Sequence, residues 1–249
     1  MKKILALLLA ICTLLALCGC SKNSDGEEAS ATATIEGKGF KSAEKAILAY
    51  AQALQSGDVK EILSTFAMET YVENLDEEAY LASSGSYYTS SQGLFGSDAY
   101  SKEIRLVKRQ YEITNLLSYI YLHHTGLDVS TPISVRDGYE DAGDLVGALV
   151  VEDWMDILAE MEIGRVVEAE LLIPDQMLEG YRENLSKRAD MFNCDELVSL
   201  AVQITLDGTD YYLCVDVACY DGKWYNLTHG GMLGSMLGGS YDTGLLVER

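Results

Sequence analysis

Apolar side chains recur at helical spacing in the first folded part of the chain. Ser42 is a favourable N-cap, and the apolar residues after it fall at i, i+3, i+4, i+7, i+8 and i+11. Gly57 ends this helix, and Asp58 caps a second one in which Glu61 completes a capping box. The pattern predicts a tight pair of helices joined at residues 56–58.

Two more helices are expected in the middle of the chain, between loops at residues 83–97 and 126–143. Residues 98–124 contain neither Gly nor Pro and predict one helix, with a break near Asn115 left open. Residues 144–162 predict the other, ended by Gly164. The first of these helices carries two neighbouring apolar stripes: Ile104, Val107 and Tyr111 form one, and Leu106, Ile113, Leu117 and Ile120 form the other.

The pattern changes to alternation after Gly164. Residues 167–173 alternate as a half-buried strand does, and Pro174-Asp175 opens another amphipathic helix. Three strands follow at 197–206, 211–220 and 223–228, and Asp-Gly pairs separate them, which is a strong hairpin signal. In the second hairpin Cys219 should face Trp224. Helices first and an antiparallel meander last predict an α+β fold.

The first 20 residues have the pattern of an export signal. A basic start is followed by an apolar run from Ile4 to Cys18, which is short for a membrane span. Leu17-Cys18-Gly19-Cys20 resembles the lipobox of bacterial lipoproteins, which implies cleavage before Cys20 and diacylglycerol on its thiol. Cys18 is a competing acceptor, although Leu17 stands where that family has a small residue. An unlipidated secreted form and a retained transmembrane anchor remain alternatives.

The signal sequence and the changes of pattern along the chain predict four parts. Residues 1–19 are the lipoprotein signal peptide, and residues 20–39 are a flexible tether, because they carry a single large apolar side chain, Ile35. Residues 40–230 form a single α+β domain with a helical insertion at about 71–163, and residues 231–249 form a Gly-rich tail. We therefore expect a protein anchored by lipid to the extracytoplasmic face of the cell membrane.

Three cysteines remain beyond the lipidation site: Cys194, Cys214 and Cys219. Export permits disulfides, but an odd number leaves at least one thiol free. Cys214 and Cys219 lie five residues apart in one predicted strand, so their side chains point to opposite faces and cannot bridge. A bond from Cys194 to either one stays open, and three reduced thiols is the favoured interpretation.

The helix pair at residues 42–66 and the hairpin Tyr220-Asp-Gly-Lys-Trp-Tyr225 resemble exported Gram-positive lipoproteins with a nuclear-transport-factor-2-like, or cystatin-like, fold. The resemblance covers about residues 40–70 and 165–228. It implies N-terminal helices packed on a C-terminal curved antiparallel sheet of about four strands. Residues 71–163 depart from the compact plan of that superfamily.

Candidate metal ligands have simpler explanations. His123 and His124 are adjacent on a predicted helix and point about 100° apart, so one metal could not readily bind both. Residues 137–144 lack the glycine and glutamate of a calcium loop. A solvated helix face explains an acidic stripe with i, i+4, i+8 spacing, formed by Glu152, Asp156 and Glu160. We expect no metal and, without a phosphate loop or dinucleotide motif, no cofactor.

The net charge of −21 repels phosphate backbones and excludes a nucleic-acid-binding protein. Loss of residues 1–19 makes it −23, which favours neutral or cationic partners. With no catalytic motif, the leading interpretation is a non-catalytic domain that binds a small ligand or a cell-envelope protein. The alternative is a small hydrolase or isomerase with Asp216, His229 and a tyrosine converging in a pocket between sheet and helices.

Overall fold

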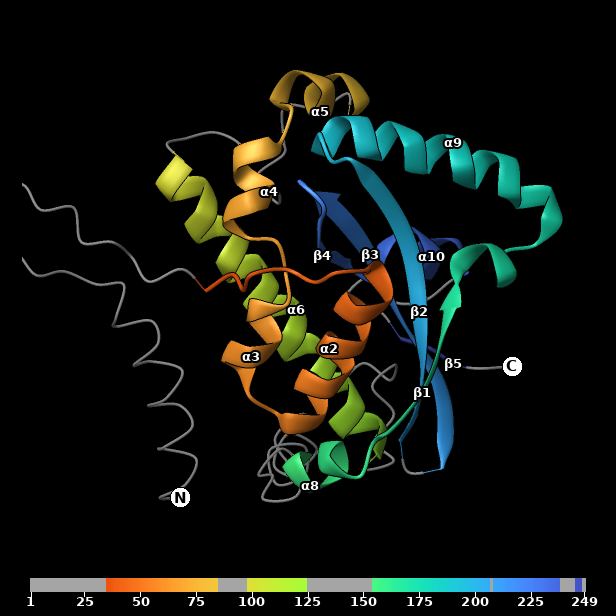
Figure 1. Cartoon of the computed structure of the whole chain (residues 1–249). Coiled ribbons are helices and arrows are strands. Elements are labelled where there is room, and N and C mark those ends of the chain that lie inside the picture. The colour runs from red at the N-terminus through yellow and green to blue at the C-terminus, as the bar shows by residue number, and fades with distance from the viewer. Residues whose placement is uncertain (1–34, 85–97, 125–153, 207, 238–244, 248–249) are drawn as a thin grey trace, which may run out of the picture. The chain divides into compact units, whose positions relative to one another are not determined.

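The structure is a computed structural model that describes residues 35–84, 98–124, 154–206, 208–237 and 245–247, all within one compact unit (Figure 1). Among these residues, none of the helices combines the length and hydropathy that crossing a bilayer requires. The helices are α2 (Ala43–Ser56), α3 (Val59–Ser64), α4 (Glu69–Asn74), α5 (Glu77–Ser84), α6 (Asp98–His124), α8 (Trp154–Ala159), η2 (Ala169–Leu171), α9 (Asp175–Phe192) and α10 (Gly231–Met236). The strands are β1 (Glu162–Glu168), β2 (Glu196–Leu206), β3 (Thr209–Tyr220), β4 (Lys223–His229) and β5 (Leu245–Val247).

The sheet is an antiparallel meander in the order β1-β2-β3-β4, which confirms the α+β prediction. The short strand β5 pairs with residues 211–213 of β3. Asp221 and Gly222 both have positive φ, at 49° and 70°, as a two-residue type I′ hairpin requires. This turn sets Cys219 opposite Trp224, as predicted. A bulge follows between Asp216 and Val217, where β4 carries one extra residue.

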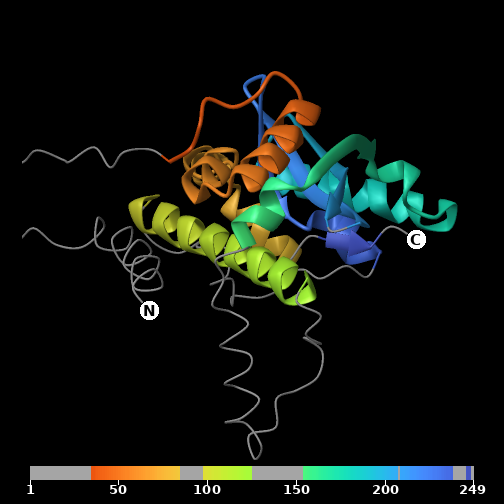
Figure 2. The ribbon, with the colours of Figure 1, turned by 90° about the horizontal axis from the view of Figure 1, so that it is seen from below.

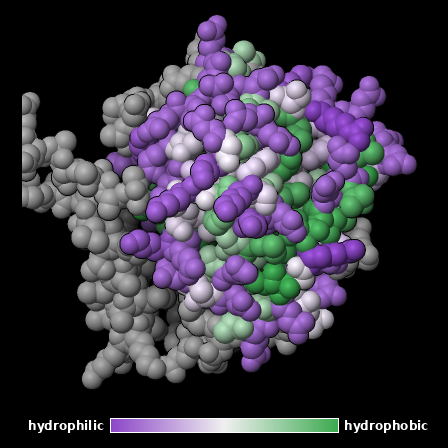
Figure 3. Space-filling view, in the orientation of Figure 1, coloured by the Kyte–Doolittle hydropathy of each residue, from purple (hydrophilic) through white to green (hydrophobic). Residues whose placement is uncertain are grey.

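Each face of the sheet is covered by different helices. On one face α2 contributes Ile47, Tyr50 and Leu54 to the main core, together with Val202 and Val215 of the sheet. On the other face α9 and α10 cover a second set of buried residues, among them Ala201, Cys214 and Leu233. Hydrophilic side chains dominate the face in Figure 3, and hydrophobic ones gather at its right, over the sheet.

The edge of β4 is covered by the segment between α3 and α4. The N–H of Ala67 donates to the carbonyl of Asn226 at 2.9 Å, and the N–H of Asn226 donates to the carbonyl of Thr65 at 3.0 Å. The side-chain amide of Asn226 also donates to the carbonyl of Ala46 in α2, at 2.9 Å. Because an open strand edge is a pairing hazard, this cover protects the sheet and fixes α2 and α3 against it.

Helix α6 has its predicted bounds and no break, but one of its predicted stripes is wrong. It runs beside α3 and α4, as both views show (Figures 1 and 2). Ile113 is buried and Leu106 and Leu117 pack on the core, whereas Val107 and Tyr111 are 54% and 61% exposed. Side chains four apart lie on one helix face, and the inward face here carries basic residues at 105 and 109 in place of the expected stripe.

Two predicted boundaries around Gly164 are also wrong. The helix expected over 144–162 ends at Ala159 where the structure describes it, and β1 already begins at Glu162. The strand expected over 167–173 ends at Glu168 and gives way to the 3-10 turn of η2. Gly164 ends no helix: it lies at an irregularity of β1, where a Cβ would come within 3.1 Å of the Gln203 Cβ.

The domain extends beyond both of its predicted ends. Ile35 packs on the core, and the N–H of Gly37 donates to the carbonyl of Ser64 at 2.9 Å, so residues 35–39 belong to the domain and not to a tether. In the predicted tail, α10 packs on β3 and buries Leu233 completely. Within residues 71–163 the described elements before β1 are all helices.

Candidate functional site

Asp216 and His229 do not converge, contrary to the enzyme hypothesis. Their strands are neighbours, but Asp216 is paired with Thr228 and His229 with Val215, so the two side chains lie on opposite faces of the sheet. Asp216 lies on the face covered by α9 and α10, and His229 lies on the face covered by α2. A single pocket therefore cannot use both groups.

Asp216 is the centre of a buried polar network. Its side chain is completely buried, and Oδ2 accepts from the Thr228 hydroxyl at 2.8 Å and pairs with the Arg188 guanidinium at 2.6 Å. Oδ1 accepts from the Ser199 hydroxyl and from the Met232 N–H, which lies 3.2 Å away. One carboxylate thus connects β2, β3 and β4 to α9 and α10, which is a structural role.

His229 does meet a tyrosine, as the hypothesis required. Its Nδ1 lies 2.8 Å from the hydroxyl of Tyr50 in α2, and the two rings are edge to face with centroids 5.8 Å apart. Burial raises the pKa of Tyr50 well above its usual value, and the charge of Glu112 adds to this rise. Tyr50 is therefore a neutral hydroxyl that fixes the imidazole of the last residue of β4.

A cluster of basic residues that the sequence reasoning missed lies beside this pair. We call it the inner basic cluster: Tyr71 of α4 with Arg105, Lys108, Arg109 and Glu112 of α6. Arg105 is 2% exposed and donates through Nε to the carbonyl of Ala67 and through Nη2 to the carbonyl of Leu227, both at 2.9 Å. Its guanidinium lies 3.5 Å from the centre of the Tyr71 ring. These contacts hold α6 against β4 and α4.

Arg109 lies one turn further along α6 and is 1% exposed. Its Nη2 donates to Glu112 Oε1 at 2.9 Å, and Nη1 lies 2.6 Å from Oε2, so this pair is bidentate. The guanidinium also lies 5.8 Å from the ring centre of Phe66, which contacts Tyr50 edge to face at 5.0 Å. Phe66 therefore contacts both the arginine and Tyr50.

Burial dominates the electrostatics of the inner basic cluster. Burial, assisted by the charge of the neighbouring Arg109, lowers the pKa of Arg105 to about 10 and that of Lys108 to about 8. The pKa of Arg109 is also lowered by burial, against the opposing effect of Glu112. Burial raises the pKa of Tyr71, although both arginines favour its ionised form. The hydroxyl of Tyr71 is thus within electrostatic reach of three guanidinium groups, those of Arg105, Arg109 and Arg188.

Two donors of this cluster lack an acceptor within the described part of the chain. The Tyr71 hydroxyl and the Arg109 Nε–H are both buried and have no hydrogen-bond partner there. Buried polar atoms in folded proteins are almost always paired with protein, water or ligand. The spacing of Arg105, Lys108 and Arg109 was the one available signal, since three of 18 basic residues fall within five positions.

The remaining predicted residues do not join this site. Cys194, Cys214 and Cys219 are all free, and burial raises the pKa of the Cys194 thiol to about 11. Cys20 and the acidic segment 137–144 lie outside the described residues. The same holds for Glu152 and for the side chains of Asp156, His123 and His124, whereas Glu160 is described and exposed.

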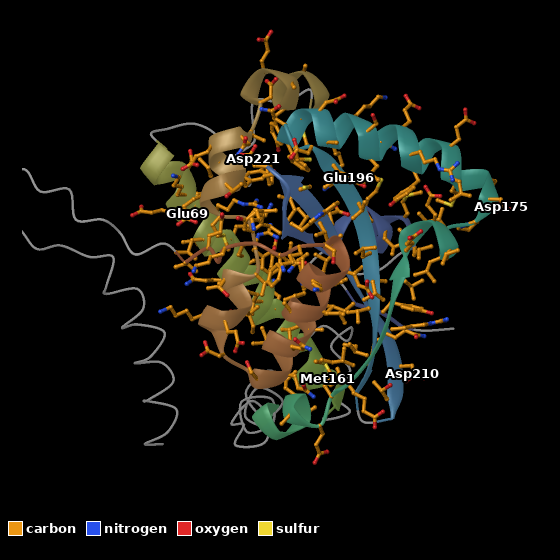
Figure 4. All side chains as sticks on the ribbon, in the orientation of Figure 1. Glu69, Met161, Asp175, Glu196, Asp210 and Asp221 are labelled. Atoms are coloured by element: carbon orange, nitrogen blue, oxygen red, sulfur yellow. The ribbon has the colours of Figure 1, made fainter. Side chains whose placement is uncertain are left out.

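The acidic residues are spread around the domain. Figure 4 shows Glu69, Asp175, Glu196, Asp210 and Asp221 at separate places, with the last two near opposite ends of β3. In the described ranges, no three His, Cys, Asp or Glu side chains are grouped so that they could hold a metal ion. The charged side chains that the structure does bring together are the basic ones of the inner basic cluster.

The comparisons with known proteins give one match. No protein-family model matches the sequence, and no curated protein matches it. The fold is similar to the crystal structure of a cystatin-like protein from Ruminococcus gnavus ATCC 29149, with a TM-score of 0.45 and 12% sequence identity. The match covers 83% of this chain and 44% of that one, so the chain spans less than half the length of that protein.

Proposed function

We propose that this protein is a lipid-anchored, extracytoplasmic binding domain rather than an enzyme. The observation that carries the binding role is the inner basic cluster, which brings charged side chains into the domain interior without full pairing. The observation against catalysis is the separation of Asp216 and His229 on opposite faces of the sheet. The anchor rests on the lipobox-like segment before Cys20.

The acidic character of the chain fits this proposal. A net charge of −23 after loss of residues 1–19 would repel an anionic bilayer, so lipid would be needed to hold the domain at a membrane. Two acyl chains suffice for stable anchoring, because each buried methylene contributes about 0.8 kcal/mol. The domain would then stand away from the membrane surface.

The anchor is tested by labelling cells with palmitate and separating membrane from soluble protein. Cys20→Ala should abolish the label and release the protein from the membrane, while the matched variant Cys18→Ala should keep both. Label that persists in Cys20→Ala and disappears in Cys18→Ala would move the site to Cys18. Label that persists in both variants would overturn the assignment to Cys20, and absence of label from the wild-type protein would overturn the lipid anchor.

The binding role is tested by native mass spectrometry of the anchored protein extracted in mild detergent. A defined adduct on the folded protein, lost on denaturation, is the expected result. Turnover of a substrate by the purified protein in an activity screen would contradict the non-catalytic role.

The enzyme alternative has one specific observation in its favour, the 2.8 Å contact between the Tyr50 hydroxyl and His229 Nδ1. A tyrosine that orients an imidazole is compatible with general-base chemistry of the hydrolase or isomerase type. If this alternative held, Tyr50→Phe would lower any activity found in the screen and shift its pH profile. Unchanged activity in Tyr50→Phe would remove this alternative.

A further inference from the structure

The charges of the inner basic cluster do not balance. Arg105, Lys108 and Arg109 are three cations, and among the described residues Glu112 is the one carboxylate that shifts all three of their pKa values. Arg188, which also acts on Tyr71, is already paired with Asp216. A buried charge without a counterion is expensive, so the described residues leave a site that favours an additional negative charge.

The two unpaired polar groups, the Tyr71 hydroxyl and the Arg109 Nε–H, are both hydrogen-bond donors. Tyr71 can donate its hydroxyl proton, and Arg109 can donate from Nε, so both atoms call for an acceptor. Tyr71 and Arg109 are each 1% exposed, so bulk water does not supply this acceptor. Because Arg105 lies over the Tyr71 ring and is held by two backbone carbonyls, the phenol is fixed in place before any ligand arrives.

We propose that the inner basic cluster binds an oxyanion, the carboxylate or phosphate group of a small ligand, through the Tyr71 hydroxyl and Arg109 Nε–H, with Lys108 and Arg105 supplying the balancing positive charge. This inference deepens the proposed binding function and rests on it. It reverses the expectation of neutral or cationic partners from net charge, since the local charge around Tyr71 is opposite in sign to that of the chain. A charge-assisted hydrogen bond in such a buried site is stronger than its counterpart at the surface.

Glu112 sets the selectivity of the site. Its carboxylate occupies both Nη atoms of Arg109, so the ligand meets the Nε side of the guanidinium and not the bidentate fork. An anion would thus add to the existing pair without displacing it. The burial of Arg105 and Arg109 favours a compact anionic group over a polyanion such as nucleic acid.

The test measures thermal unfolding of the full chain in mild detergent by tryptophan fluorescence. Inorganic phosphate and acetate are titrated separately at constant ionic strength set with sodium chloride, so that the two arms distinguish a phosphate from a carboxylate. The transition temperature should rise with the logarithm of the concentration of at least one of these anions once that concentration exceeds the Kd, and the onset of the rise gives an apparent Kd.

Tyr71→Phe is the deciding variant, because it keeps the ring against Arg105 and removes only the hydroxyl. Its apparent Kd should be at least about tenfold weaker, since a hydrogen bond to a charged group is lost. Without anion it should be no less stable than wild type, because the lost hydroxyl has no partner within the described residues. Tyr111→Phe, on the exposed face of α6, should bind as wild type does.

An equal response of Tyr71→Phe and wild type would overturn the proposal, and so would the absence of any response to both anions. Neither result would affect the palmitate label at Cys20 or the membrane location. An anchored protein with a bound adduct but no anion response would keep the binding function and reject this site. A soluble, unlabelled protein whose anion response is weakened by Tyr71→Phe would reject the lipid anchor and keep this site.

Discussion

Replacing Asp216 tests whether the buried network on the second face of the sheet is structural. Asp216→Asn keeps the shape of the side chain but removes the charge that pairs with Arg188 at 2.6 Å. Removal of one partner of a buried ion pair costs about 3–5 kcal/mol. Arg188 remains 25% exposed and keeps some contact with water, so we expect a loss near the lower end, about 3 kcal/mol.

The assay is equilibrium unfolding in guanidinium chloride, followed by circular dichroism. The midpoint should fall while the slope stays the same, because the surface exposed on unfolding does not change. Asp210→Asn is the matched control. This aspartate is exposed near the start of β3 and accepts a hydrogen bond from the Thr205 hydroxyl, so its replacement should cost less than about 0.5 kcal/mol.

A double-mutant cycle separates the ion pair from the rest of the network. Arg188→Met alone leaves a fully buried carboxylate without its cation and should also be destabilising. The double variant should lose at least about 1 kcal/mol less than the two single losses added together, because no uncompensated charge remains. Strict additivity, or a cost of Asp216→Asn as small as that of Asp210→Asn, would refute the structural role.

Two further predictions concern the ends of the domain. Gly231→Ala should destabilise the fold by about 2 kcal/mol or more in the same assay, because Gly231 has φ of 53° and an added Cβ would overlap the Asp216 carboxylate. In the control Gly180→Ala, in α9, the added Cβ meets nothing within 4 Å, so this change should be neutral or stabilising. Similar effects of the two substitutions would contradict the packing at Gly231. Burial raises the pKa of Glu36, so the neutral carboxyl favours the folded state at low pH and this contribution to stability is lost as pH rises through the folded pKa. In urea titrations Glu36→Gln should therefore gain stability relative to wild type as pH rises above about 4.5, and a constant difference would contradict this.

Sequence patterns correctly predicted the elements that depend only on residues close together in the chain, such as helix caps and hairpin turns. Ser42 caps α2 through its hydroxyl, Gly57 ends it with φ of 68°, and Asp58 caps α3 with two backbone hydrogen bonds. The Asp221-Gly222 turn set the register of β3 and β4. These features need only neighbours in sequence, so periodicity and turn chemistry are sufficient to find them.

The candidate site depends on contacts that no local pattern encodes. Arg105 is buried because the carbonyls of Ala67 and Leu227, 38 and 122 residues away, accept its hydrogen bonds. Apolar spacing instead predicted a stripe that includes Val107 and Tyr111, both of which are exposed, because spacing alone counts arginine as polar and ignores its hydrogen bonds. The opposite orientation of Asp216 and His229 likewise follows from a bulge that a strand pattern does not reveal.

The most direct test of the central claim is the mass of the N-terminal peptide of the protein extracted from its own membrane. We predict that the mature chain begins at Cys20 and carries diacylglycerol on that thiol. A peptide that begins at Met1, or an unmodified peptide that begins after another cleavage site, would contradict the lipid-anchored domain proposed for this chain.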